Sequence, residues 1–133
     1  MDIVFWLILL FVLFDLVIVG WIFFFRKRAF DDNQRRYFLE RWKAIQAESD
    51  NRHKVMEADK LIDKVLSKKG YSGPLGEKLK RSGKLFSDID GLWAAHKLRN
   101  RLAHEFDVKI NDAVAAKAMS SFKMALKDLD VIK

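Results

Sequence analysis

The sequence predicts an all-α protein in which a single N-terminal transmembrane helix precedes a small helical bundle. Residues 3–25 are apolar apart from Asp15 and Gly20. After Phe30, the apolar residues recur with the 3.6-residue period of amphipathic helices, and no run shows the two-residue alternation of a half-buried strand. A length of 133 residues leaves room for one small domain beside the apolar segment.

The apolar segment is long enough to cross a bilayer as a helix. At about 1.5 Å per residue it would reach roughly 30 to 35 Å, which matches the hydrocarbon thickness. A cleaved signal peptide would have a basic beginning, a shorter apolar run and small residues at its end. This segment follows an aspartate and ends in three phenylalanines and Arg26. We therefore interpret residues 1–28 as a transmembrane anchor with a basic stop.

The charge distribution predicts the orientation of this anchor. All 25 basic residues follow the apolar segment, beginning with Arg26, Lys27 and Arg28, which we expect to lie near the lipid headgroups. By the positive-inside tendency, the C-terminal part is cytoplasmic and the chain is a single-pass protein of the inner, cytoplasmic membrane. Without Asp2 and Asp15, 16 of the 18 acidic residues remain, so the rest of the chain carries a net charge of +9. Such a domain suits lipid headgroups and RNA about equally.

Asp15 lies near the middle of the apolar segment, where an ionised carboxylate costs several kcal/mol. No basic residue of the same helix can pair with it. Two interpretations stay open. Asp15 forms an interface with another membrane helix, from a different membrane protein or a second copy of this chain, or it is a protonated side chain that a very apolar anchor tolerates.

Residues 29–49 are predicted to form a juxtamembrane amphipathic helix. Either Asp31 or Asp32 can cap its first turn, because a short acidic side chain accepts a backbone N–H there. Basic residues surround its apolar positions, which are Phe38, Trp42 and Ile45.

Residues 50–133 are predicted to form the bundle. A helix over residues 50–69 has a continuous apolar stripe and meets Gly70, a typical residue at a helix end. The stripe consists of Val55, Ala58, Leu61, Ile62, Val65 and Leu66.

The segment GYSGPLG, residues 70–76, interrupts the helical pattern with three of the six glycines and the only proline. A short turn or helix follows it. The next long helix begins near residues 88–90 and runs to about Phe106, and the last begins at residues 111–112. The apolar side of that last helix carries Val114, Ala118, Phe122, Ala125, Leu126 and Leu129. Helices of this kind with short connections form a compact bundle.

The stretch HKLRNRLAHE, residues 96–105, belongs to the helix that ends near Phe106. At about 100° per residue, Arg99 falls in the middle of an apolar stripe and His96 lies beside it, whereas Asn100 and His104 lie along one flank. The opposite, solvent-facing side carries Lys97, Arg101 and Glu105. The stripe consists of Ile89, Leu92, Ala95, Leu102, Ala103 and Phe106.

A guanidinium on an apolar stripe must be paired, or it must border a groove or an interface. In a structural interpretation, Arg99 holds a carboxylate of a neighbouring helix, and the sequence offers Glu57, Asp59 and Asp63. In a functional interpretation, the same group meets a phosphate. His96 is expected to be a hydrogen-bonded residue of the core or of an interface.

The residues RNRLAH, from Arg99 to His104, resemble the motif of HEPN domains, in which an arginine, a polar residue and a histidine recur at this spacing. The flanking text ADKLIDKVL, GYSGP and LWAAHKLRNRLAHE is similar to that of HEPN-like proteins of candidate-phyla-radiation bacteria. The resemblance covers roughly residues 50–133. It implies a small helical bundle of a superfamily that is usually dimeric and includes many metal-independent ribonucleases.

The resemblance also implies roles for particular residues. His104 would act as general acid or base on an RNA 2′-hydroxyl or leaving oxygen. Arg99 would steady the phosphate and Asn100 would orient the histidine or the backbone around it. The solvent-facing Lys97 and Arg101 would contact the phosphates of RNA.

The resemblance implies a homodimer. Arg99 and His104 are about 140° apart on a regular helix, so one chain does not easily point both at one phosphate. Two chains around a two-fold axis can do so. No cofactor is expected, and no metal site either, because the chain has no cysteine and its three histidines lack the spacing of metal ligands.

Three functions stay open at this point. The chain is a membrane-anchored endoribonuclease that does not need a metal, or a non-catalytic module that dimerises through the same residues, or a membrane scaffold that binds a partner through Asp15. An intact set of arginine, asparagine and histidine favours catalysis over a purely structural role.

Overall fold

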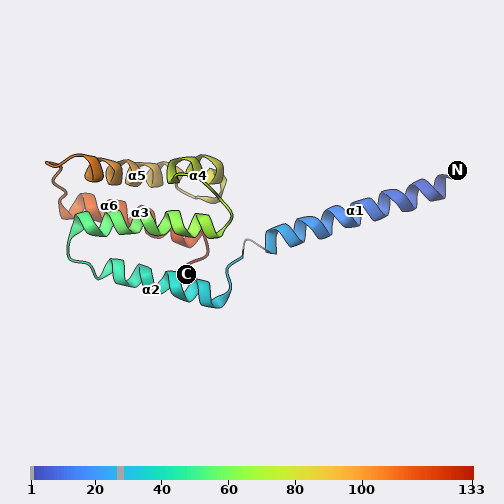
Figure 1. The fold of residues 1–133 in the computed structure, drawn as a ribbon, viewed down its shortest axis with the longest axis horizontal. Helices are drawn as coiled ribbons and strands as arrows, with labels where there is room; N and C mark the ends of the chain where they lie inside the picture. The colour runs from blue at the N-terminus through green and yellow to red at the C-terminus, as the bar shows by residue number, and fades with distance from the viewer. Residues whose placement is uncertain (1, 27–28) are drawn as a thin grey trace. The chain divides into compact units, whose positions relative to one another are not determined.

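The computed structural model describes residues 2–26 and 29–133, and it divides the chain into two compact units, residues 1–30 and 31–133. The first unit contains one helix, α1 (Ile3–Arg26), drawn in blue in Figure 1. Its residues Ile3–Phe23 have a mean hydropathy of 2.9, so this helix is long and apolar enough to cross a membrane. Every side chain from residue 2 to 23 is exposed. The side chains of Arg26, Lys27 and Arg28, predicted to lie near lipid, are outside the described residues.

The second unit is entirely helical over residues 31–133, all of which the structure describes, as the sequence predicted. Its helices are α2 (Asp32–Gln46), α3 (Asn51–Lys68), α4 (Leu75–Ser82), α5 (Ile89–His104) and α6 (Asp112–Asp128), with a 3-10 turn at Gly83–Leu85.

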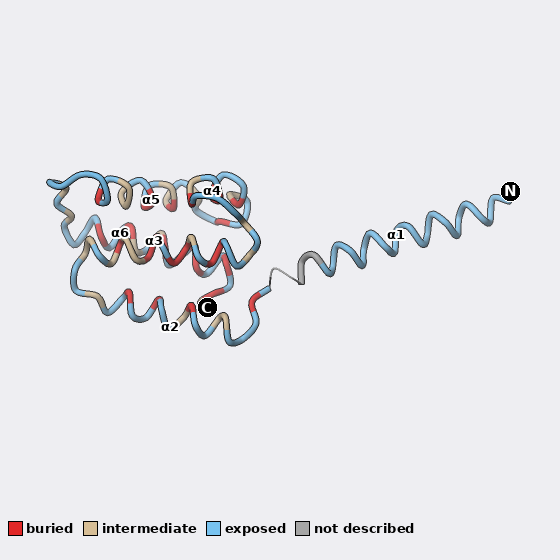
Figure 2. Tube along the Cα trace, in the orientation of Figure 1, coloured by how far each residue is buried: buried red, intermediate tan, exposed pale blue. Residues whose placement is uncertain are grey.

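Helix α3 is the centre of this unit. It packs against α2, α5 and α6, and α6 also packs against α5. Figure 1 shows α2 on one side of α3 and α5 on the other. The predicted stripe of α3 is buried along its whole length, and buried positions recur along every helix of the unit but not along the described part of α1 (Figure 2). Helix α2 is therefore part of the same compact unit as the predicted bundle.

The predicted helix starts are confirmed at the level of single hydrogen bonds. Asp31, Asp50, Asp88 and Asn111 each accept the backbone N–H three residues later, which is the geometry of an N-terminal cap. At the end of α3, Gly70 has a φ of +99°, a conformation that favours glycine, and the next N–H returns to the Leu66 carbonyl.

The expected end of α5 was wrong. The helix stops at His104 because Glu105 adopts an extended conformation. Residue 106 consequently leaves the apolar stripe, and Phe106 is 98% exposed instead of buried. Ala103 is exposed as well, and so is Val114 of the predicted apolar side of α6. Arg52 of α3 explains the early stop, since its guanidinium donates to the carbonyls of Leu102 and Glu105.

The helices give this unit two distinct ends. At one end, where the chain enters α2, Arg35 pairs with Asp130 beyond α6 at 2.6 Å. At the other, which we call the His104 end, α5 stops and α3 and α6 begin. There the Asn51 amide donates to Asp112 at 2.6 Å.

Candidate functional site

Helix α5 places the predicted site residues in two separate groups. His96 and Arg99 contact the buried Asp59 of α3 and Asn100 contacts both of them, whereas His104 is exposed as the last residue of α5. The structure therefore brings Arg99 and Asn100 together but does not bring either of them to His104. Asn100, expected to orient His104, contacts Arg99 and His96 instead.

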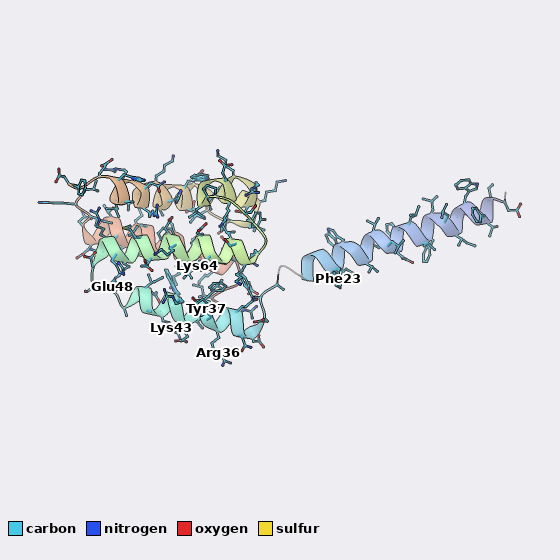
Figure 3. All side chains as sticks on the ribbon, in the orientation of Figure 1. Phe23, Arg36, Tyr37, Lys43, Glu48 and Lys64 are labelled. Atoms are coloured by element: carbon cyan, nitrogen blue, oxygen red, sulfur yellow. The ribbon has the colours of Figure 1, made fainter. Side chains whose placement is uncertain are left out.

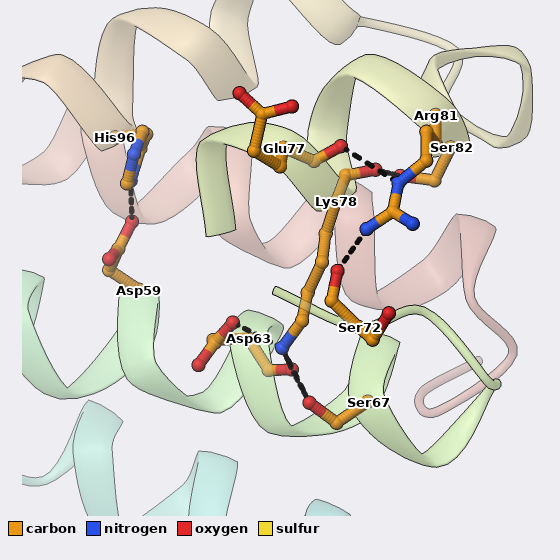
Figure 4. A network of polar contacts seen from close by, with 9 residues as sticks. All are labelled: Asp59, Asp63, Ser67, Ser72, Glu77, Lys78, Arg81, Ser82 and His96. Atoms are coloured by element: carbon orange, nitrogen blue, oxygen red, sulfur yellow. Dashed lines mark hydrogen bonds and ion pairs between the residues drawn. The ribbon is translucent and has the colours of Figure 1, made fainter. Parts of the chain in front are cut away.

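Asp59 and three residues of α5, His96, Arg99 and Asn100, form a closed circuit of polar contacts, which we call the Asp59 ring. The His96 Nδ1 lies 2.8 Å from the Asp59 Oδ1, a contact shown in Figure 4. The His96 Nε2 lies 3.4 Å from the Asn100 Nδ2. The Asn100 Oδ1 accepts from the Arg99 Nη1 at 3.1 Å, and the Arg99 Nε lies 3.4 Å from the Asp59 Oδ2. Each residue of the ring thus holds two others.

The contacts of the ring fit one tautomer of His96. The Asn100 amide nitrogen can only donate, so the Nε2 that faces it accepts. The other nitrogen, Nδ1, then carries the hydrogen and donates it to Asp59. The Arg99 guanidinium forms an ion pair with the buried Asp59 and balances its charge.

Only some of the guanidinium nitrogens of Arg99 have partners in the ring. Its Nε is buried and forms an ion pair with Asp59 without a hydrogen bond, whereas 32% of the side chain is exposed. Within the described part of the chain, Nη2 donates to no residue and is not buried. The inner edge of the guanidinium is therefore held by Asp59, and the outer edge keeps N–H donors for an anion.

The partner of Arg99 is now assigned among the three carboxylates that the sequence offered. Asp59 is the partner. Glu57 instead bonds Lys60 at 3.0 Å, and this hydrogen bond lowers the pKa of Glu57 below its usual value. Asp63 bonds Lys78 at 2.7 Å. The inner edge of Arg99 thus pairs with a carboxylate, as in the structural interpretation. Its exposed outer edge is free to meet a phosphate, as in the functional interpretation.

His104 is available for chemistry. Its imidazole is exposed, and it takes part in no hydrogen bond or ion pair with any residue that the structure describes. It lies about 7.5 Å further along α5 than Arg99 and about 140° around it. The Arg52 guanidinium, bonded to the two carbonyls at the end of α5, holds the backbone next to His104.

The remaining predicted residues are placed as follows. Lys97 and Arg101 are exposed on the outer side of α5, and Arg101 is within 3.8 Å of Glu105. His96 is buried, with the Trp93 ring 5.9 Å away in an edge-on arrangement. Asp15 is exposed on α1.

Sequence reasoning missed the central role of Asp59. The signal was present, because Asp59 follows Val55 by four residues and precedes Ile62 by three, which places it on the apolar stripe of α3. A carboxylate on one stripe and a guanidinium on another predict a pair when their helices pack together. Which carboxylate would pair depended on the relative position of α3 and α5.

A second buried charge, at Lys78, was also missed. Its side chain is 5% exposed, and Nζ bonds the Asp63 Oδ1 at 2.7 Å, the Ser67 Oγ at 2.5 Å and the Asp63 carbonyl at 3.3 Å (Figure 4). An ammonium has three donors, so these acceptors satisfy all of them. Lys78 therefore ties α4 to α3 and has nothing left for a ligand.

The comparisons with known proteins gave no match: no family model, no curated protein and no solved structure matches this chain. Among the described residues, no three histidine, aspartate or glutamate side chains gather in a group that could hold a metal ion. The resemblance to HEPN domains stays a prediction from the motif and its setting.

Proposed function

We propose that this chain is a membrane-anchored HEPN-like protein whose cytoplasmic domain cleaves RNA as a dimer, without a metal ion. The observation that carries the proposal is the state of Arg99. Its inner edge is held by Asp59, its outer edge is exposed, and the same helix ends in an exposed histidine with no partner among the described residues. In RNA transesterification, a free imidazole can transfer the protons and a fixed guanidinium can stabilise the charge that develops on the phosphate.

The proposed chemistry uses only groups of this chain and of the RNA. The 2′-hydroxyl oxygen attacks the adjacent phosphorus while its proton passes to the His104 imidazole acting as base. The bond from phosphorus to the 5′-oxygen breaks. The leaving 5′-oxygen takes a proton from His104, which is the acid in its protonated, imidazolium form. Charge develops on the non-bridging oxygens, which accept from the outer edge of Arg99.

The dimer follows from the placement of the two groups. Because Arg99 and His104 lie on different sides of α5, a phosphate that meets the guanidinium of one chain is better reached by the imidazole of another. A two-fold axis next to α5 creates two such mixed sites. In this proposal α1 spans the membrane and keeps the site at the cytoplasmic face, where the excess of basic residues is expected.

The decisive experiment uses the full chain in detergent micelles, with a chelator and labelled RNA oligonucleotides of varied sequence. We expect His104→Ala to lower the cleavage rate by at least about a hundredfold. The matched control is His53→Ala, because His53 is also an exposed histidine and belongs to another helix, α3. Absence of cleavage by folded, dimeric wild-type protein across these RNAs would refute the enzyme.

A second candidate function has its own observation. The Asp59 ring closes within one chain, so it stabilises the fold whether or not a substrate binds. The chain would then be a non-catalytic HEPN-like module that dimerises, or acts as a scaffold in a membrane complex, through α5 and Asp15. Such a module needs the Asp59 ring for its stability but needs no catalytic group. In that case His104→Ala leaves every RNA intact and does not change the stability of the domain, and Asp15→Leu alters the proteins that crosslink to the full chain.

A further inference from the structure

A groove of about 630 Å³ lies between the first half of α2 and the second half of α3. We call it the Tyr37 groove. Figure 3 labels a residue from each of its sides, Tyr37 on α2 and Lys64 on α3. Its lining combines two aromatic rings, two lysines and two amides, which belong to Tyr37, Phe38, Lys64, Lys68, Asn33 and Gln34.

The lining suits a ligand with an apolar part next to an anionic one. The Tyr37 ring is exposed and stands edge-on to the Phe38 ring, with 5.5 Å between the centroids. Lys64 and Lys68 are exposed and form no ion pair with any described residue. Lysine stems cover apolar surface while their ammonium groups stay in water, and tyrosine favours the boundary between the two.

The charges of the Tyr37 groove differ from those of another groove of similar size in the bundle. That other groove, of about 560 Å³, is lined by residues of α2, α3 and α6 and also contains two lysines, Lys54 and Lys123. That groove includes the carboxylate of Asp112, and the Tyr37 groove includes no acidic side chain. An anion therefore meets less repulsion in the Tyr37 groove.

The covalent chain limits how far this groove can be from a membrane that α1 crosses. Only residues 27–31 separate α1 from α2, and five residues reach at most about 18 Å. Asn33 and Gln34 belong to the first turn of α2. The phosphates of the leaflet in which α1 ends are consequently the anions at the highest local concentration.

We propose that the Tyr37 groove binds the phosphate headgroup of an anionic phospholipid, with Lys64 and Lys68 at the phosphate and Tyr37 against the glycerol region. The proposal rests on the membrane anchor of the proposed function and is independent of RNA cleavage. The Tyr37 groove lies at the end of the bundle where the chain enters α2. The His104 end is the opposite end of the bundle, so a domain docked in this way keeps His104 accessible from the cytoplasm.

The test places the full chain in phosphatidylcholine vesicles with or without phosphatidylglycerol. The chain has no cysteine, so Asn33→Cys provides a single labelling position at the groove. Quenching of its fluorophore by headgroup-labelled lipid measures contact with the membrane surface. We expect more quenching when phosphatidylglycerol is present, and loss of that difference in the Lys64→Glu/Lys68→Glu variant. The control, Lys117→Glu/Lys123→Glu, makes the same charge change at exposed positions of α6 and should keep the difference.

Several results would overturn the proposal. The difference could be absent in the wild-type protein, or the α6 control could lose it to the same extent, which would indicate diffuse attraction. Displacement by soluble glycerol phosphate at equal phosphate concentration would identify a site for free phosphate, and displacement by an RNA oligonucleotide a site for RNA. A second reporter, Val12→Cys on α1, tests the membrane anchor separately from the groove. If quenchers on the acyl chains do not reach this label, α1 is not in the membrane, and both the membrane anchor and the groove proposal are refuted.

Discussion

Helix α3 carries two carboxylates one turn apart, and each receives a cation from a different helix. Asp63 meets Lys78 of α4, and Asp59 meets Arg99 of α5. The ammonium of Lys78 is enclosed and has all its donors satisfied by the chain. The guanidinium of Arg99 is held on one edge and open on the other. The difference teaches that burial of a charge does not by itself indicate a site, and that only a held charge with unused donors can also bind a ligand.

The difference has a physical origin in the two side chains. An ammonium is a compact charge that three acceptors can surround completely, but a planar guanidinium presents donors along several edges. Residues of one face can hold only part of it. A pair built with arginine can therefore serve the fold and a ligand at once, and the four predictions below separate these two roles.

The largest effect is expected from Asp59→Ala. Removal of this carboxylate leaves the Nδ1 of His96 without an acceptor and the buried Nε of Arg99 without its counter-charge, which costs about 3 kcal/mol of unfolding free energy. Urea unfolding of the full chain in micelles, followed by tryptophan fluorescence, measures the loss. RNA cleavage by the remaining folded protein should fall too, since Arg99 loses its ion pair and keeps only its hydrogen bond to Asn100. A change below 1 kcal/mol would mean that the ring does not form in solution.

A smaller loss of stability is expected from Asp63→Ala, about 2 kcal/mol. Lys78 becomes a buried charge without its carboxylate, but the Ser67 hydroxyl and the backbone carbonyl still accept, and Asp63 itself is 39% exposed. The same urea titration measures this change. Cleavage per folded molecule should equal that of the wild type. If it fell as far as in Asp59→Ala, the two pairs would not differ in function.

Arg99→Lys sharpens the comparison at the site itself. The charge stays, but the forked donor that can hold Asp59 and a phosphate together is lost. We expect about tenfold weaker RNA binding, measured by fluorescence anisotropy, and a loss of less than 1 kcal/mol in unfolding free energy. Unaltered RNA affinity would show that the outer edge of Arg99 does not meet the phosphate.

The smallest effect is expected from Glu57→Gln, the third carboxylate of this region of α3. Its hydrogen bond to Lys60 lowers the pKa of Glu57 in the folded chain, so the bond stabilises the fold above the usual value of 4.5 and is lost as the pH falls through the lowered pKa. At neutral pH the variant should lose less than about 0.5 kcal/mol, as is typical of a surface pair. The difference from the wild type should vanish once the pH falls below the lowered pKa of Glu57. A difference that persists in acid would contradict this.

The course of the helices could be predicted because their signals are local. Asp31, Asp50, Asp88 and Asn111 cap helices through hydrogen bonds to residues three positions away, and Gly70 ends α3 through its own backbone conformation. The end of α5 could not be predicted in this way. It depends on Arg52, a residue fifty positions earlier, which meets the last carbonyls of α5 only after α3 and α5 pack together.

The sequence by itself determined an apolar helix at the N-terminus, an all-helical unit after it, and a guanidinium on the apolar side of α5. These follow from periodicity and capping, which act over a few residues. Only the tertiary structure decided that Asp59 is the partner of Arg99, that His96 and Asn100 complete the ring, and that His104 and Phe106 face solvent. The reason is that an ion pair between helices depends on their relative position, which packing of the whole core sets.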